Sequence, residues 1–277
     1  MYWYSKSYDN PSPTSPGTCR YGGITSADRG PQCAPATIIA MARRPTPTDA
    51  EPTTGLAHIA DLIRETVPPL HRAGIPFVAV PAAIALAGRK HGWIRTPATV
   101  AALATAAFFR HPSRVPPNAP GVVVAPADGQ VALVDHAAPP AELGLGDTPR
   151  PRVSIFLSVF DVHVQRIPAA GKVEAIEYRS GSFLSADLPE ASDANERNSM
   201  LIRTDDGAEL AVVQIAGLLA RRIVCDAKPG DQVTLGDTYG LIRCGSRVDL
   251  YLPEGTRPLV AVGQRAVGAE TVLAQLK

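Results

Sequence analysis

The segment KPGDQVTLGDTYGLIRCGS, residues 228–246, carries the most informative pattern in this chain of 277 residues. Its internal glycines predict tight turns between short strands, because glycine adopts the positive φ angles that hairpin turns require. These glycines are Gly230, Gly236 and Gly240. The segment ends at Gly245-Ser246, between two apolar runs that are typical of strands. We therefore expect a β-rich fold that holds this dipeptide in a kink between two strands.

Short apolar or alternating runs separated by turn residues recur throughout the C-terminal half of the chain. They are residues 122–125, 130–135, 153–160, 172–178, 200–203, 209–215, 232–235 and 247–252. Only 5% of the residues are aromatic, whereas 27 are proline and 23 are glycine, which suits strands and turns better than a helical bundle. We expect residues 115–277, which begin with a proline-rich connector, to form an antiparallel β-sandwich or barrel-like catalytic domain.

The N-terminal part of the chain has a different composition. Residues 1–54 are rich in proline, serine, threonine and glycine and show no apolar periodicity, which predicts a disordered tail without a secretory signal. We expect Met41 to be an alternative start of translation. A short amphipathic helix is expected near residues 56–63.

Two charge-free apolar stretches follow, at residues 73–88 and 96–109, with Trp93 between them. As helices they would be roughly 21–24 Å long, shorter than the ~30 Å thickness of bilayer hydrocarbon. Between Thr66 and Ala127 the chain has six Arg or Lys residues and no Asp or Glu. We expect residues 55–114 to form a membrane-associated helical hairpin that lies in or dips into an anionic leaflet. The alternative is a pair of core helices in a soluble domain.

Three residue types needed for nucleophilic chemistry occur in separate segments. The hydroxyl of Ser246 can attack the preceding carbonyl if a base takes its proton, although a Gly-Ser pair is usually an ordinary turn. Asp128 follows an apolar run and precedes glycine, a pattern also typical of a hairpin turn. In FLSVFDVHVQRIP, residues 156–168, strand periodicity places Asp161, His163 and Gln165 on one face. An aspartate, a histidine and a serine are together the residue types that a base-activated nucleophile requires.

In this order, with Gly-Ser near the C-terminal end, the segments resemble the phosphatidylserine decarboxylase family, in particular its short bacterial and archaeal branch. The resemblance runs from about Phe108 to Pro253. It includes FFRHPSR at residues 108–114, where His111 stands in place of an acidic residue, and NERN at residues 195–198.

The resemblance implies a proenzyme that cleaves itself between Gly245 and Ser246. A β chain ending at Gly245 and an α chain of residues 246–277 would remain together as a heterodimer, with further dimerisation left open. Ser246 would become a covalent pyruvoyl cofactor that forms a Schiff base with phosphatidylserine, without pyridoxal phosphate. Loss of CO₂ would then give phosphatidylethanolamine in phospholipid biosynthesis.

The resemblance also implies roles for three other side chains and a location. Asp128 would orient the base that deprotonates Ser246, and His163 would act as that base and as a proton donor in decarboxylation. Arg166 stands where longer members carry a second histidine, and we expect it to meet the lipid phosphate. The enzyme would be peripheral on the cytoplasmic face of the cell membrane.

Composition argues against other kinds of partner. With 27 basic and 26 acidic residues, no overall positive field favours nucleic acid. The four cysteines form no CxxC pair, which argues against a structural metal site; they are Cys19, Cys33, Cys225 and Cys244.

Three alternatives to a lipid decarboxylase remain. A lipoyl- or biotinyl-type carrier domain needs a lysine at a hairpin tip, and none lies between Lys228 and Lys277. A membrane-tethered scaffold without chemistry would keep one intact chain. A pyruvoyl-dependent decarboxylase of a soluble amino acid would not need the basic, apolar hairpin.

Overall fold

The computed structural model describes residues 55, 67–181, 194–217, 222–243 and 245–276. These residues belong to one compact unit, Thr54–Lys277. The expected N-terminal tail and the helix near residues 56–63 lie outside the described residues, and both stay predictions.

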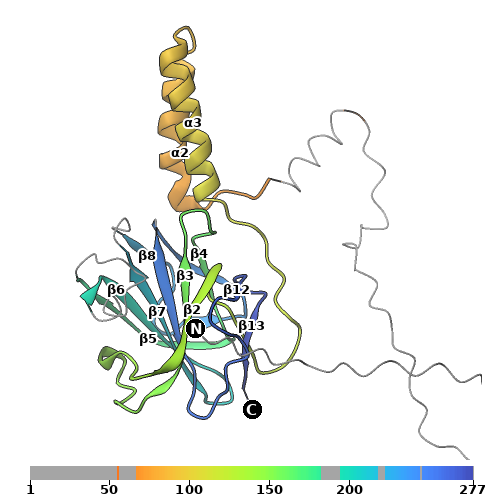
Figure 1. Ribbon diagram of the computed structural model, residues 1–277, viewed down its shortest axis with the longest axis vertical. Helices are drawn as coiled ribbons and strands as arrows, with labels where there is room; N and C mark the ends of the chain where they lie inside the picture. The colour runs from red at the N-terminus through yellow and green to blue at the C-terminus, as the bar shows by residue number, and fades with distance from the viewer. Residues whose placement is uncertain (1–54, 56–66, 182–193, 218–221, 244, 277) are drawn as a thin grey trace, which may run out of the picture. The chain divides into compact units, whose positions relative to one another are not determined.

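A helical hairpin opens the described part of the chain. A short 3-10 turn, η1 (Arg72–Gly74), leads into α2 (Ile75–Ala87), and α3 (Gly92–Phe108) returns beside it (Figure 1). At the base, Leu70 pairs with Arg110. A Cβ atom on Gly74 would lie 2.3 Å from Cγ of Phe109, so only glycine permits the close contact that joins the two ends. The two predicted helices are therefore present.

The hairpin packs little of its surface against other protein. α2 has no buried residue and α3 has only Ala98. Their large apolar side chains are exposed instead; they include Ile75, Phe77, Val80, Ile84, Leu86, Trp93, Val100 and Leu103. Apart from Ala98, neither helix contributes a buried residue to the described structure. Among the described residues, no helix combines the length and apolarity needed to cross a membrane.

The rest of the described chain is built from short strands joined by turns. They are β1 (Val122–Val124), β2 (Gly129–Ala137), β3 (Arg150–Leu157), β4 (Val164–Arg166), β5 (Gly171–Arg179), β6 (Arg197–Arg203), β7 (Glu209–Ala216), β8 (Ile223–Cys225), β9 (Gln232–Val233), β10 (Thr238–Ile242), β11 (Ser246–Tyr251), β12 (Arg265–Ala266) and β13 (Val272–Gln275), with one 3-10 turn, η2 (Ala141–Leu143).

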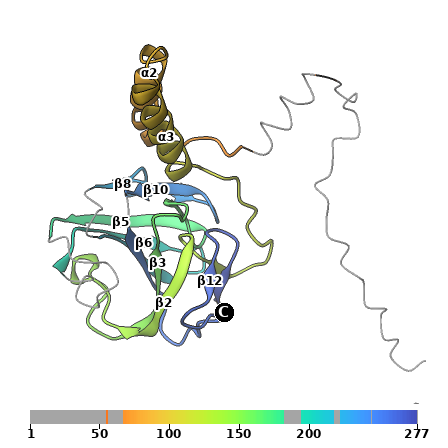
Figure 2. The same ribbon diagram turned by 45° about the horizontal axis from the view of Figure 1, so that its top comes forward.

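These strands form three antiparallel sheets within the described residues. The largest has the order β12-β2-β3-β11-β7-β6-β5-β9 and curls strongly, as Figures 1 and 2 show. The order of the smaller sheets is β4-β10-β8 and β1-β13. Strand β8 contacts β6 and β7, and β10 contacts β7, so the small sheet covers the inner face of the large one. The expected β-rich antiparallel domain is confirmed, as a curled sheet with smaller sheets on it.

The inner face of the large sheet holds the main core, and β11 shows how its residues alternate. Val248 and Leu250 belong to this core, whereas Tyr251 packs in a second cluster on the opposite face. Arg247 and Asp249 also point to that opposite face, where Arg247 Nε donates to Asp249 Oδ1 over 2.7 Å. By the two-residue period of a strand, the side chain of Ser246 lies on the same inner face as Val248.

Candidate active site

Ser246 is the first residue of β11, a central strand of the large sheet. It pairs with Leu157, the last residue of β3, on one side and with Ala216 of β7 on the other. Its side chain is fully buried on the inner face, and its Oγ has no hydrogen-bond partner among the described residues. Because buried hydroxyls are nearly always hydrogen-bonded, an unpaired one beside Gly245 is a candidate reactive group.

Gly245 precedes this serine in a backbone conformation that suits glycine. Its φ angle is +60°, in the left-handed region. A Cβ atom at this position would meet nothing within 4 Å, so the requirement for glycine comes from the backbone angle and not from crowding. The peptide bond before Ser246 therefore sits in an open kink, as predicted.

His163 is the buried base candidate. Its Nδ1 lies 2.9 Å from the main-chain oxygen of Asp161, which only accepts hydrogen bonds, so Nδ1 carries the proton. The lone pair of Nε2 is then free, and Nε2 has no partner among the described residues. Burial lowers the pKa of His163 to about 4, despite the carbonyl of Asp161. The ring is a neutral base near pH 7.

The Phe108 ring at the end of α3 helps to exclude water from this histidine. The centroids of the Phe108 and His163 rings lie 4.3 Å apart. The hairpin base therefore forms one wall of the site. Arg110, two residues on, donates from Nη2 to the main-chain oxygen of Phe160 over 2.6 Å and fixes the neighbouring turn.

The topology brings His163 and Ser246 to the same end of the sheet. After Leu157, which pairs with Ser246, the chain turns at Ser158–Asp161 and reaches His163. The carboxylate of Asp161 closes this turn by accepting from the main-chain nitrogen and hydroxyl of Ser158, each over 2.8 Å. From the other side, the Ile242 nitrogen donates to the His163 oxygen over 3.3 Å, shortly before Gly245-Ser246.

A chain of three buried amides runs across this inner face; sequence analysis placed Gln165 beside His163 and Asn198 in the NERN segment, but did not identify Gln214. Asn198 Nδ2 donates to Gln214 Oε1, and Gln214 Nε2 donates to Gln165 Oε1, each over 3.0 Å. Gln165 Nε2 has no partner among the described residues. Gln214 pairs with Val248, so it shares the face of Ser246. The sequence signal for Gln214 was a polar residue inside the otherwise apolar run AVVQIA, residues 211–216.

The Asp128 carboxylate forms its hydrogen bonds with groups other than His163. Its carboxylate accepts from Arg114 Nη2 over 2.7 Å and from the main-chain nitrogen of Gly268 over 2.8 Å. Burial raises the pKa of Asp128, and these two donors oppose the rise. Among the described residues it makes no hydrogen bond to His163 or Ser246; the group that orients His163 is the carbonyl of Asp161. The predicted role of Asp128 in self-cleavage stays a prediction.

Arg166 is also placed differently from the expectation. It is 9% exposed, and its guanidinium donates to the main-chain oxygens of Pro112 over 2.7 Å and Gly236 over 3.3 Å. These bonds tie the connector after the hairpin to the turn before β10. The geometry favours this structural role over the expected contact with a lipid phosphate.

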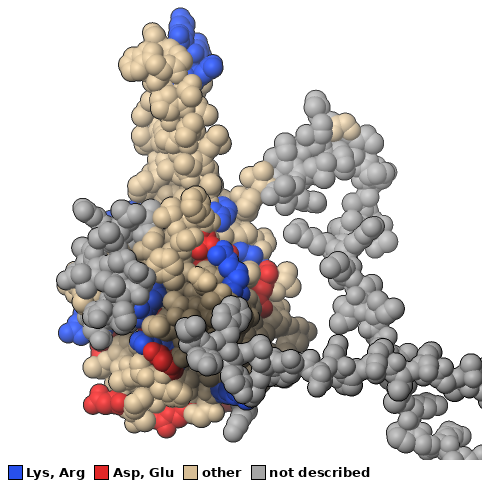
Figure 3. Space-filling view, viewed as in Figure 1, with Lys and Arg blue, Asp and Glu red and all other residues tan. Residues whose placement is uncertain are grey.

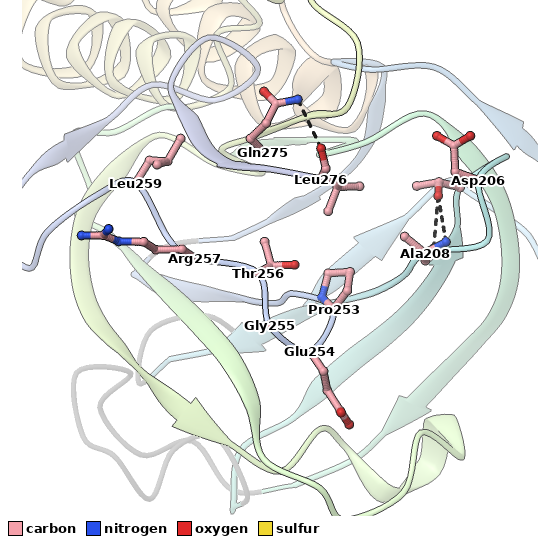
Figure 4. A pocket seen from close by; sticks show the side chains of 11 residues that line it. Asp206, Ala208, Pro253, Glu254, Gly255, Thr256, Arg257, Leu259, Gln275 and Leu276 are labelled. Atoms are coloured by element: carbon pink, nitrogen blue, oxygen red, sulfur yellow. Dashed lines mark hydrogen bonds between the residues drawn. The ribbon is translucent and has the colours of Figure 1, made fainter.

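The pocket drawn in Figure 4 lies elsewhere and takes in none of these residues. It has a volume of about 400 Å³ and is lined from the β6–β7 turn and the C-terminal segments around residues 253–259 and 275–276. Glu254 and Arg257 point away from each other, and Gln275 Nε2 turns back to the oxygen of Leu276 over 3.4 Å. Its polar groups do not converge on a common point, so we do not assign it to the chemistry.

The chain was compared with known proteins. The model of the family described as phosphatidylserine decarboxylase matches residues 101–274, which hold every site residue above. A protein of Nocardia farcinica named phosphatidylserine decarboxylase proenzyme is 66% identical over 236 residues, which is 85% of this chain and 100% of that protein. Proteins of the same name from Rhodococcus jostii and Mycobacterium marinum are 64% and 60% identical, with the same coverage. The chain therefore belongs to the phosphatidylserine decarboxylase family.

Proposed function

We propose that this protein is a proenzyme that cuts itself between Gly245 and Ser246, converts Ser246 into a pyruvoyl group, and decarboxylates phosphatidylserine to phosphatidylethanolamine. The observation that carries the proposal is the pair of buried, unpartnered atoms, Ser246 Oγ and His163 Nε2, at one end of the sheet. The left-handed Gly245 beside them supports it, as do the relatives named proenzymes.

The self-cleavage needs a base, and the free lone pair of His163 Nε2 would supply it. As Nε2 takes the proton, Oγ of Ser246 attacks the carbonyl carbon of Gly245; Nε2 then passes this proton to the nitrogen of residue 246 as the amide C–N bond breaks, which leaves an ester and a free amine. Loss of the Cα proton of residue 246 then breaks the Cβ–O bond and releases Gly245 as a carboxylate. The remaining dehydroalanine takes up water and loses ammonia, which leaves the pyruvoyl group.

The strands favour two chains that stay together after the cut. In the α chain, β11 remains between β3 and β7, β12 remains beside β2, and β13 remains beside β1. Most hydrogen bonds of the fold thus survive the loss of one peptide bond. Cleavage would produce a stable heterodimer of the two pieces.

The residues around position 246 fit a pyruvoyl group. When present, its ketone supplies an electrophile for the substrate amine and a sink for the electrons left by CO₂. His163 Nε2 would first take a proton from the ammonium group of the substrate and would later deliver it to the carbon that loses CO₂. Gln165 Nε2, an unpaired buried donor, would hold an oxygen of the substrate.

The hairpin favours a lipid substrate over a soluble amino acid. Figure 3 shows that the visible length of the helical hairpin is uncharged and that Lys and Arg side chains lie at its far end. The basic residues near the turn, Arg89, Lys90 and Arg95, would be costly at the bilayer centre but favourable among anionic headgroups. We propose that the hairpin lies along the interface, on the cytoplasmic face. Equal cosedimentation with neutral and phosphatidylserine-containing vesicles would contradict the role of the basic tip.

The activity is tested by CO₂ release from carboxyl-labelled phosphatidylserine in detergent micelles, with free serine in a parallel reaction. We expect release from the lipid, with phosphatidylethanolamine formed in equal amount, and none with Ser246→Ala. Release from free serine but not from the lipid would replace the lipid proposal with the soluble amino acid alternative.

A further inference from the structure

A second cavity lies at the base of the hairpin and borders the site. It has a volume of about 290 Å³ and is lined by Phe77, Ala104, Thr105, Phe108, Phe109 and Arg243. Phe108 separates it from His163, because its ring contacts both. Arg243 directly follows β10 and stands three residues before Ser246. The cavity therefore lies between the apolar hairpin and the reactive serine.

Arg243 differs from most arginines that are largely buried in the β domain, and also from Arg166, which donates to two main-chain oxygens. Four of these pair with a carboxylate in the described structure; the pairs are Arg114–Asp128, Arg152–Asp135, Arg197–Glu142 and Arg247–Asp249. Among the described residues no carboxylate pairs with Arg243, and its Nε is buried without a hydrogen-bond partner. Its Cζ instead lies 4.7 Å from the centroid of the Phe77 ring.

This arrangement leaves a cation in partly apolar surroundings without an anion. The Phe77 ring holds the guanidinium in place through a cation–π contact. A guanidinium without a carboxylate partner gains from a ligand that brings a negative charge and accepts two hydrogen bonds. A phosphate diester has these properties, and the remaining lining of the cavity, without charged groups, suits a hydrocarbon chain.

Resting on the proposed function, we propose that Arg243 binds the phosphate of phosphatidylserine and that the cavity takes the first part of one acyl chain. In this lipid the phosphorus is four bonds from the amine nitrogen, so the phosphate must lie near the reacting group at position 246. The volume is near the low end of the ~300–1,000 Å³ typical of ligand pockets, which suits part of a chain and not a whole diacyl lipid.

The test separates the phosphate from the acyl chain by using two compounds. The KM for dioleoyl phosphatidylserine is measured in detergent micelles, and the inhibition constant is measured for glycerophosphoserine, which lacks acyl chains. Arg243→Met should raise both constants about 10-fold or more, because it removes a charge-assisted bond to the shared phosphate. Arg243→Lys should restore part of the loss.

A bulky residue in the cavity should affect only the acylated substrate. Ala104→Trp should raise the KM for the diacyl lipid and leave the inhibition constant of glycerophosphoserine unchanged. Ala101→Trp is the matched control, since Ala101 is exposed on the same helix and does not line the cavity.

The rates are expressed per cleaved chain, measured by intact mass, so that slower maturation is not mistaken for weaker binding. Unchanged constants in mature Arg243→Met would overturn the phosphate assignment. If Arg243→Met does not mature, an equal KM for Ala104→Trp and Ala101→Trp overturns the inference. Failure of the wild type to cleave or to release CO₂ would instead refute the proposed function.

Discussion

The neutral state of His163 can be tested through the pH dependence of stability. The comparison uses Ser246→Ala, which stays in one chain, with and without His163→Gln. Because burial lowers the pKa of folded His163 to about 4, below the ~6.5 of an unfolded histidine, protons bind preferentially to the unfolded chain between these values. The contribution of neutral His163 to the free energy of unfolding is therefore fully present above about pH 6.5 and is lost as the pH falls towards 4.

The expected magnitude follows from the two pKa values. Between about pH 7 and pH 4.5, titration of His163 should lower the free energy of unfolding by about 2.5 kcal/mol. Urea unfolding at both pH values should show this extra loss only in the protein that keeps His163. The titrations of His71 and His111, whose pKa values burial also lowers, occur in both proteins and cancel. An equal pH dependence in the two proteins would refute the neutral, buried base.

Three further predictions concern neighbouring residues. Gly245→Ala should slow self-cleavage about 5- to 30-fold, measured as uncut chain over time, because a Cβ makes the left-handed angle costly by about 1–2 kcal/mol; an unchanged rate would contradict the kink. Arg166→Met should lower the free energy of unfolding by about 1–3 kcal/mol by unpairing a buried and a partly buried carbonyl, with a normal KM for the lipid; a raised KM would restore its phosphate role. Phe108→Ala in the Ser246→Ala background should admit water and raise the pKa of His163, measured by NMR titration. An unchanged pKa of His163 would contradict the exclusion of water by the Phe108 ring.

The sequence predicted the strands that carry regular apolar runs and missed those that do not. Strands β8, β12 and β13 have at most four residues, so tertiary pairing decides them and not local pattern. The predicted run 153–160 overshot the end of β3 at Leu157. The residues beyond it are apolar, but the carboxylate of Asp161 closes a turn there. Apolarity alone does not show where a strand ends.

The candidate site was predictable where residue type limits the chemistry. Ser246, Gly245 and His163 were named from motif and resemblance, and the structure places them at one end of the sheet. The partners of Asp128 and Arg166 were not predictable, because they depend on loops brought together only by folding. The same holds for Arg243, whose significance lies in the absence of a carboxylate partner among the described residues.

The central claim is that Ser246 is converted by cleavage of the bond before it. The intact mass of the denatured wild-type protein, beside Ser246→Ala, tests this most directly. We expect two pieces divided after Gly245, the smaller one blocked at its N-terminus and lighter than residues 246–277 by the loss that turns serine into pyruvoyl. A single uncut chain in folded wild-type protein would contradict it.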